Sequence, residues 1–74
     1  MLDKIKEIIA GFMGIRVSEV KEDSNFLEMG MDSLTLLKIV MDVETLFGIN
    51  IQNDEIVEIR TAIDIFNLVE KKLS

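Results

Sequence analysis

Cysteine and histidine are both absent from this 74-residue sequence. Without cysteine there is no disulfide, no thiolate metal site and no thiol nucleophile belonging to the chain itself. Without histidine the chain lacks the side chain that most often serves as a general base or a metal ligand near neutral pH. The two absences predict a protein that is not an enzyme and that binds no metal.

Long apolar runs are also absent: 49% of the residues are hydrophobic, but charged residues interrupt them throughout. This pattern excludes a membrane span and indicates one small soluble domain over residues 1–74, near the lower size limit for a core without disulfides or metals. The first residues lack the pattern of a signal peptide, so we expect a cytoplasmic protein, and we expect a monomer.

Fourteen acidic and eight basic residues give a formal net charge of −6. That charge repels nucleic acid and anionic membranes, and it favours partner proteins with a basic docking surface. It also favours solubility, and the composition alone does not separate these two roles.

Amphipathic helices are predicted at both ends of the chain. The first is capped by Asp3 and ends before Gly14, the residue just past its last turn. Its apolar residues recur at helical spacing: Ile5, Ile8, Ile9 and Phe12. Near the other end, Thr61 and Asp64 form a capping-box pattern. It opens a helix whose apolar residues are Ala62, Ile65, Phe66, Leu68, Val69 and Leu73.

The segment formed by residues 14–32 is long for a connection in a compact domain. Its apolar residues are irregularly spaced: Ile15, Val17, Val20, Phe26, Leu27 and Met29. We therefore expect a loop that is held in place because these side chains lie over the core.

The sequence is organised around the run Phe26-Leu27-Glu28-Met29-Gly30-Met31-Asp32-Ser33-Leu34. Gly30 can take the left-handed conformation that ends a turn, and Asp32 can cap a helix that begins at Ser33. The Ser33 hydroxyl then lies in solvent beside unpaired backbone N–H groups, at the positive end of the helix dipole. A phosphate on that oxygen would be stabilised there.

The helix predicted over residues 33–47 has three faces. Its core arc contains Leu36, Ile39, Val40, Val43, Leu46 and Phe47, and its solvated arc contains Thr35, Lys38, Asp42 and Thr45. A separate apolar stripe begins beside Ser33 and consists of Leu34, Leu37 and Met41. Either the helix is buried on two sides, or this stripe docks partner proteins.

After Gly48, the extended residues 49–51 lead to a short helix predicted over residues 54–59 and capped by Asn53. We expect Asp54, Glu55 and Glu58 to form an acidic ridge near the end of the second helix. Together the segments predict an all-α fold, a small four-helix bundle with three long helices and one short one, and with a long loop between the first two helices.

The run from Phe26 to Leu34, its continuation Leu37-Lys38-Ile39-Val40 and the closing Leu46-Phe47-Gly48-Ile49 resemble the attachment region of acyl and peptidyl carrier proteins. The resemblance extends through Thr61-Ala62-Ile63-Asp64-Ile65 and covers nearly the whole chain. In this family a phosphopantetheinyl transferase places 4′-phosphopantetheine on the serine of Asp-Ser-Leu, and the cofactor thiol carries acyl, polyketide or aminoacyl groups as thioesters. The resemblance therefore implies a covalent cofactor on Ser33, flanked by Asp32 and Leu34.

Partner contacts are implied by the same resemblance. The expected docking residues are Leu34, Leu37, Met41, Glu44, Asp54 and Glu55. They would meet the transferase, an acyl- or aminoacyl-loading enzyme, and synthases or transferases with basic or apolar docking surfaces. A carried chain would fold back between the second and third helices, against Ile39, Val43, Ile51, Ile56 and Ile59. Its burial would be weak, because opening a packed core offsets the gain from burying methylenes.

Compared with carriers of fatty acid synthesis, the second helix has few acids and the run before Ser33 is one residue shorter. Both differences favour a specialised or discrete carrier of acyl, polyketide or aminoacyl units. A calcium loop at Asp23-Ser24-Asn25 lacks its glycine at Glu28, and a hydrolase at Ser33 lacks a histidine. The remaining alternative is an unmodified helical module that binds a partner through the apolar stripe.

Overall fold

The fold consists of helices and connections only, in a computed structural model that describes all 74 residues. The elements are α1 (Leu2–Met13), the 3₁₀ turn η1 (Val17–Glu19), α2 (Ser33–Phe47), α3 (Asn53–Ile56) and α4 (Ala62–Leu73). The predicted all-α bundle, with three long helices, one short helix and a long first connection, is confirmed. No helix combines the length and the apolar character that a membrane crossing needs.

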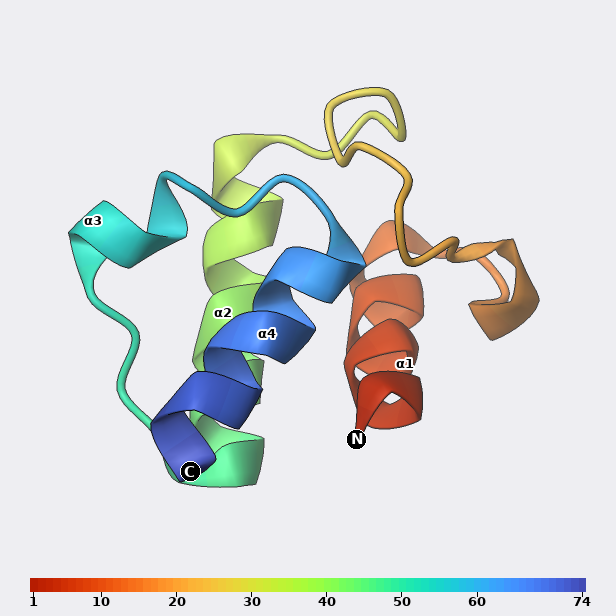
Figure 1. Cartoon of the computed structure of the whole chain (residues 1–74). Helices are drawn as coiled ribbons and strands as arrows, with labels where there is room; N and C mark the ends of the chain where they lie inside the picture. The colour runs from red at the N-terminus through yellow and green to blue at the C-terminus, as the bar shows by residue number, and fades with distance from the viewer.

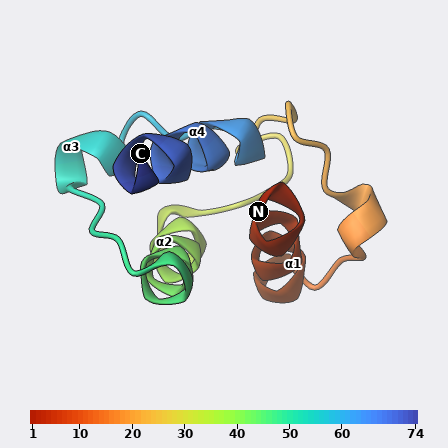
Figure 2. The same cartoon turned by 60° about the horizontal axis from the view of Figure 1, so that its bottom comes forward.

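The three long helices form two layers. Helices α1 and α2 lie side by side, and α4 lies across them (Figure 1, Figure 2). The short helix α3 stands at the outer side of α2, away from α1 (Figure 1). The chain therefore closes its core between α1, α2 and α4, and α3 covers only one edge.

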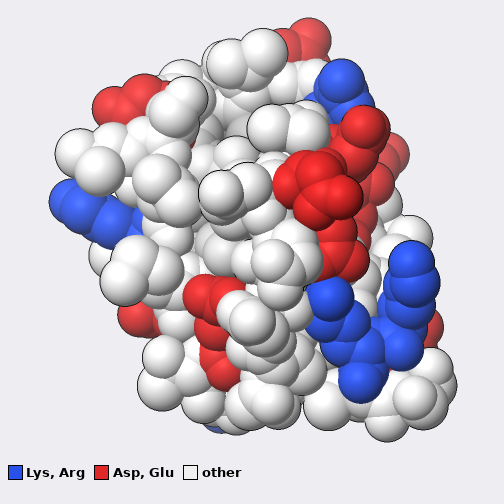
Figure 3. All heavy atoms as spheres, turned by 90° about the vertical axis from the view of Figure 1, so that its left-hand side faces the viewer, with Lys and Arg blue, Asp and Glu red and all other residues white.

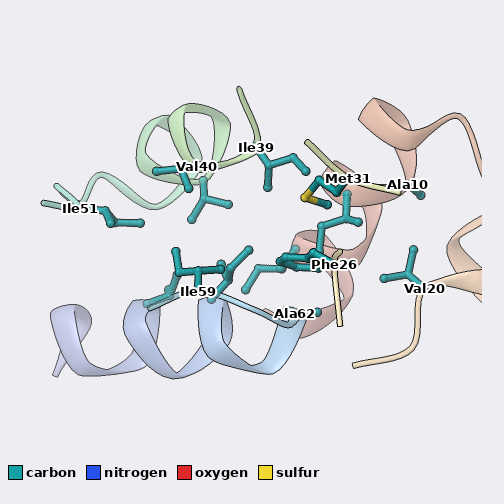
Figure 4. Packing of buried hydrophobic residues seen from close by; sticks show 14 residues of the cluster. Ala10, Val20, Phe26, Met31, Ile39, Val40, Ile51, Ile59 and Ala62 are labelled. Carbon is teal, nitrogen blue, oxygen red and sulfur yellow. The ribbon is translucent and has the colours of Figure 1, made fainter. Parts of the chain in front are cut away.

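The core is a single apolar cluster with no buried polar or charged residue. Its largest fully buried side chains are Ile5, Ile9, Ile39, Val40, Val43, Ile65 and Val69. Figure 4 shows Val40 of α2 facing Ile59 across the core, with Phe26 directed into the space between the helices. Each such side chain contributes about 1.5–3 kcal/mol when it is fully buried, so apolar burial supplies most of the stability of this domain.

The connection between α1 and α2 is fixed to the connection between α3 and α4 and to the first turn of α4. The N–H of Phe26 donates to the carbonyl of Arg60 (2.8 Å), and the N–H of Ile63 donates to the carbonyl of Glu22 (3.0 Å). Three apolar side chains of the first connection are buried: Val20, Phe26 and Met31. The expectation of a loop held over the core is confirmed for most of its apolar residues, but it is wrong for Leu27 and Val17, which are 80% and 42% exposed.

Two predicted helix starts are wrong. Helix α1 begins at Leu2, so Asp3 lies in its first turn and makes no capping hydrogen bond. Its carboxylate still lies at the favourable end of the helix dipole. Helix α3 begins at Asn53 and ends at Ile56. Its N-cap is Gln52, whose N–H donates to the carboxylate of Glu55 (2.9 Å).

Helix α2 has the predicted bounds and most of the predicted core face. Ile39, Val40 and Val43 are buried, and Leu36 and Phe47 are half-buried. Leu46 was expected in the core but is 51% exposed, because it lies at the edge of the core arc, where α1 and α4 do not cover it. The helix ends at Phe47, and the next residue, Gly48, has the left-handed conformation that often closes a helix (φ 66°).

Candidate functional site

Ser33 is the first residue of α2, and its side chain is exposed. The chain reaches it through a turn that ends at Gly30, whose φ of 83° is a conformation that side chains with a Cβ rarely adopt. Asp32 follows in an extended conformation, and the helix starts directly after it. The local sequence thus places one hydroxyl at the N-terminal end of α2.

Asp32 fixes that helix start. Its Oδ1 accepts a hydrogen bond from the backbone N–H of Thr35 (2.8 Å). The backbone and side-chain hydrogen bonds with Thr35 hold the pKa of the Asp32 carboxyl below its ordinary value. The carboxylate is therefore charged at neutral pH, and its predicted role as helix cap is confirmed.

Replacing Asp32 by alanine is expected to lower the free energy of unfolding at neutral pH, because the Thr35 N–H loses its acceptor. The pKa is lower in the folded state than in the unfolded chain, so the charged cap stabilises the fold above the unfolded pKa. That contribution is lost as the pH falls through the folded pKa. Urea unfolding of wild type and Asp32→Ala at about pH 7 and about pH 2 measures the difference, which should shrink in acid.

The matched control for this prediction is Asp32→Asn, which keeps the capping oxygen without the charge. Its stability relative to Asp32→Ala should stay nearly constant between the two pH values. An equal loss for the alanine variant at both pH values would contradict a role for the ionised carboxylate.

The backbone N–H groups of Ser33 and Leu34 have no hydrogen-bond acceptor within the chain. They belong to the first turn of a helix of 15 residues, where the helix dipole is positive. A phosphate carried on the Ser33 oxygen would thus lie beside two free donors. The favourable interaction with the dipole is worth about 0.3–1 kcal/mol, so the position suits a phosphodiester without causing its formation.

Two open hollows adjoin Ser33, and both are lined by Leu36, Val57 and Ile59. The first extends to Leu27 and Arg60. The second, of about 480 Å³, lies between α2 and α3 and also contacts Leu37, Asn53 and Ile56. The hydroxyl therefore has free space on the α3 side, and a flexible arm attached to it would meet an apolar groove.

Only part of the predicted acyl-chain pocket borders this space. Ile56 and Ile59 line the second hollow. Ile39 and Val43 are completely buried, and Ile51 is 6% exposed, so these three side chains belong to the packed core and line no hollow. A chain lying in the groove would touch Ile56 and Ile59 first, and reaching the other three would require the core to open.

The apolar stripe of α2 is exposed. Leu34 and Met41 are 61% and 60% exposed, and Leu37 is 44% exposed. The first interpretation, a helix buried on two sides, is therefore wrong. Exposed apolar side chains at this spacing, next to the candidate site, leave partner docking as the interpretation of the stripe.

The acidic docking candidates differ in whether their carboxylates have partners within the chain. Glu44 is half-buried and accepts a hydrogen bond from the N–H of Ile51 (2.8 Å), so it joins α2 to the next segment. Glu55 forms an ion pair with Lys72 (2.9 Å). Asp54 is exposed and forms no ion pair or side-chain hydrogen bond. Of the three, only Asp54 has a free carboxylate.

The position predicted for the acidic ridge is wrong. Asn53 and Val57, which are chain neighbours of the ridge residues Asp54 and Glu58, border the same hollow as Ser33 and Leu37, so α3 lies beside the first turns of α2. Figure 3 faces this side and shows uncharged atoms over the middle of the surface, with acidic atoms along one flank and basic atoms next to them. Among the residues that line the two hollows beside Ser33, only Asp32 and Arg60 are charged.

Leu27 and Val57 are site residues that the sequence analysis missed. They are 80% and 71% exposed, and both line the hollow beside Ser33. One signal was available: Leu27 follows Phe26 directly, and two adjacent residues in a turn rarely both face the core. Val57 had no such signal, because the predicted helix extended past it.

The chain nowhere gathers three or more acidic side chains in an arrangement that could hold a metal ion. The chain has no histidine, and the one carboxylate that lines the hollows beside Ser33 belongs to Asp32, which caps α2. What the arrangement offers is an accessible hydroxyl, two free N–H groups and an apolar groove. It suits a covalently attached phosphodiester arm whose chemistry is performed by other proteins.

Comparisons with known proteins agree with this geometry. The acyl carrier protein of Thermotoga maritima is 36% identical over 74 residues, which cover 99% of this chain and 91% of that protein. A crystal structure of an acyl carrier protein from the same organism has a TM-score of 0.81 at 37% identity, covering 95% of this chain and 82% of that one. Clavatol synthase claF of Penicillium crustosum is 36% identical over 56 residues, which are 76% of this chain and 2% of that protein.

A family model described as the phosphopantetheine attachment site matches residues 3–69. The match includes the whole of α2 and α3 and both hollows beside Ser33. The sequence, the fold and the geometry of the helix start agree with it, and the chain belongs to the phosphopantetheine-attachment family of carrier proteins.

Proposed function

We propose that residues 1–74 form one acyl carrier domain and that the Ser33 oxygen is the attachment point of 4′-phosphopantetheine. The observation that carries this proposal is the exposed Ser33 hydroxyl, held at the start of α2 between two open hollows. When bound, the cofactor supplies a thiol that holds acyl groups as thioesters. The chain itself is a carrier and not a catalyst, in agreement with its family.

The residues of the chain supply position and leave the chemistry to partners. Ser33 would supply the oxygen that forms the new bond to the phosphorus of phosphopantetheine, while the bond from that phosphorus to the diphosphate oxygen of coenzyme A breaks and adenosine 3′,5′-bisphosphate leaves. We infer that the Ser33 proton passes to the transferase, because the chain has no histidine and the neighbouring Asp32 carboxylate caps α2. Asp32 holds the helix start, and the free N–H groups of Ser33 and Leu34 face the phosphate. Leu36, Val57 and Ile59 form the wall along which the arm would rest.

Intact-mass measurement tests the proposal. We expect a single adduct of one cofactor mass after incubation of the purified chain with coenzyme A and a phosphopantetheinyl transferase of broad specificity. Peptide mapping should locate that adduct on Ser33. A chain that stays unmodified while a known carrier in the same tube is loaded would refute the proposal and favour an unmodified interaction module.

For the carried group and the partners, we infer a specialised or discrete carrier of acyl, polyketide or aminoacyl units rather than one of primary fatty acid synthesis. Two observations support it: only Asp32 and Arg60 are charged among the residues lining the hollows beside Ser33, and the carboxylates of Glu44 and Glu55 have partners within the chain. Loading enzymes and synthases would then dock mainly through apolar contacts with α2. A cytoplasmic, monomeric protein remains our prediction.

Met41→Glu is expected to leave the fold and the Ser33 adduct intact, because Met41 is 60% exposed. It should weaken docking of an enzyme that accepts the carried group, since a charge would enter an apolar contact. We expect the KM for the loaded carrier to rise about tenfold.

Ser18→Glu is the matched control, because it adds the same charge at an exposed position in η1, away from α2. Circular dichroism and transfer kinetics with the loaded protein measure both variants. Equal effects of the two substitutions would show that net charge, and not the apolar stripe, sets the rate of transfer.

A further inference from the structure

The short helix α3 has little to hold it in place. It contains four residues, and none of them is buried. Ile56 packs partly against the core cluster, and the neighbouring Val57 is 71% exposed. A single helical turn is not stable by itself, so the position of α3 depends on contacts with the rest of the chain.

One ion pair joins α3 to the last turn of α4. Nζ of Lys72 lies 2.9 Å from Oε1 of Glu55, and both side chains are about three-quarters shielded from solvent, at 24% and 23% exposure. It is the only ion pair between two helices of the chain and the shortest of the five. Shielding and a short distance both strengthen such a pair relative to an exposed one.

The same carboxylate oxygen also caps α3. Oε1 of Glu55 accepts a hydrogen bond from the backbone N–H of Gln52 (2.9 Å) while it contacts Lys72. These two interactions, the hydrogen bond from Gln52 first and the Lys72 ammonium second, hold the pKa of Glu55 below its ordinary value. Lys72 thus contacts Glu55, the residue whose side chain caps the start of α3.

We propose that Lys72 is a positioning residue: its ammonium clips α3 to α4 through Glu55 and so fixes the wall of the hollow beside Ser33. The wall consists of Asn53, Ile56 and Val57, which are all part of α3 or follow it directly. This inference rests on the proposed function only in taking that hollow as the place where the attached arm lies. It gives the C-terminal helix a role at a site that none of its residues touches.

Amide hydrogen exchange of the unmodified chain tests the clip. The reporting amides are those of Ile56 and Val57, which donate to the carbonyls of Gln52 (3.0 Å) and Asn53 (3.3 Å). Lys72→Met should make them exchange about two- to fivefold faster, because the loss of one partly shielded ion pair shifts local opening by that factor. Glu55→Gln should act in the same way, since the amide oxygen still accepts from Gln52 but loses the charge.

Lys71→Met is the matched control, because it removes the same charge from the same turn of α4, and Lys71 forms no ion pair with Glu55 and acts on it only as the weakest of the charges and hydrogen bonds that lower its pKa. Lys72→Arg should restore slow exchange by restoring the pair. Amides in the middle of α1 should be unchanged in every variant, since a loss of global stability would move them too. Equal exchange at Ile56 and Val57 in Lys72→Met and Lys71→Met would overturn the proposal.

The same variants separate this inference from the proposed function. The three lysine variants, Lys72→Met, Lys72→Arg and Lys71→Met, should still receive the cofactor on Ser33 in the mass measurement. If wild type received none, the function would be refuted while the exchange data would still decide on the clip. If wild type and the lysine variants all received the cofactor and the amides of α3 exchanged at the same rate in each of them, the carrier function would stand and the role of Lys72 would be rejected.

Discussion

Ser33→Ala is expected to abolish the cofactor adduct completely, while the fold and its stability stay close to those of wild type. The side chain is exposed and makes no hydrogen bond within the chain, so its removal leaves no cavity and no unpaired group. Surface substitutions of this kind change stability by about 0.5 kcal/mol or less. The measurement is intact mass after incubation with coenzyme A and the transferase, together with urea unfolding.

Ser18→Ala serves as the control, because Ser18 is an exposed serine in the short turn η1. It should be loaded as fully as wild type. An adduct that persists in Ser33→Ala would place the attachment elsewhere and would separate the family assignment from the site proposed here.

Ile39→Ala is expected to destabilise the domain by about 2–5 kcal/mol, through lost apolar burial and the cavity left behind. Ile39 is completely buried at the centre of α2. Domains are stable by about 5–15 kcal/mol, and one of this size lies toward the lower limit, so a large part of the margin would be lost. Urea unfolding followed by circular dichroism measures the change.

Leu34→Ala is the comparison for Ile39→Ala, since Leu34 lies on the same helix but is 61% exposed. It should change the free energy of unfolding by about 0.5 kcal/mol or less. The pair also examines the predicted acyl-chain pocket. A cost below about 1 kcal/mol for Ile39→Ala would mean that the side chain borders space that is already open, as that prediction requires.

Local patterns were sufficient to predict the long helices. The spacing of apolar residues in α1, α2 and α4 and the glycines after α1 and α2 act within a few residues of each other, so the sequence alone shows them. The start of α3 was misplaced for a different reason. Asn53 is the better intrinsic cap, but Gln52 takes that position because the Glu55 side chain returns to its N–H. A reciprocal contact of this kind outweighs the preference of a single residue.

For the site, the sequence identified the reactive oxygen and its cap but not its surroundings. Ser33 and Asp32 are neighbours in a run whose order fixes the helix start. The groove beside them is formed by segments far apart in sequence, from Leu27 to Val57 and Arg60, and by the exposure of single side chains. The ion pair between Glu55 and Lys72 could not be predicted from the sequence either, since the residues next to each of them do not indicate the partner.

The pairing of the two long connections has a consequence for when this chain can be loaded. Phe26 is hydrogen-bonded to Arg60, so the surface around Ser33 is assembled from segments that lie up to 35 residues apart, from Asn25 to Arg60. An unfolded or half-synthesised polypeptide does not display it. A transferase that binds this composite surface would not modify nascent or misfolded chains. The fraction of chains that carry the cofactor would then measure the fraction that has folded.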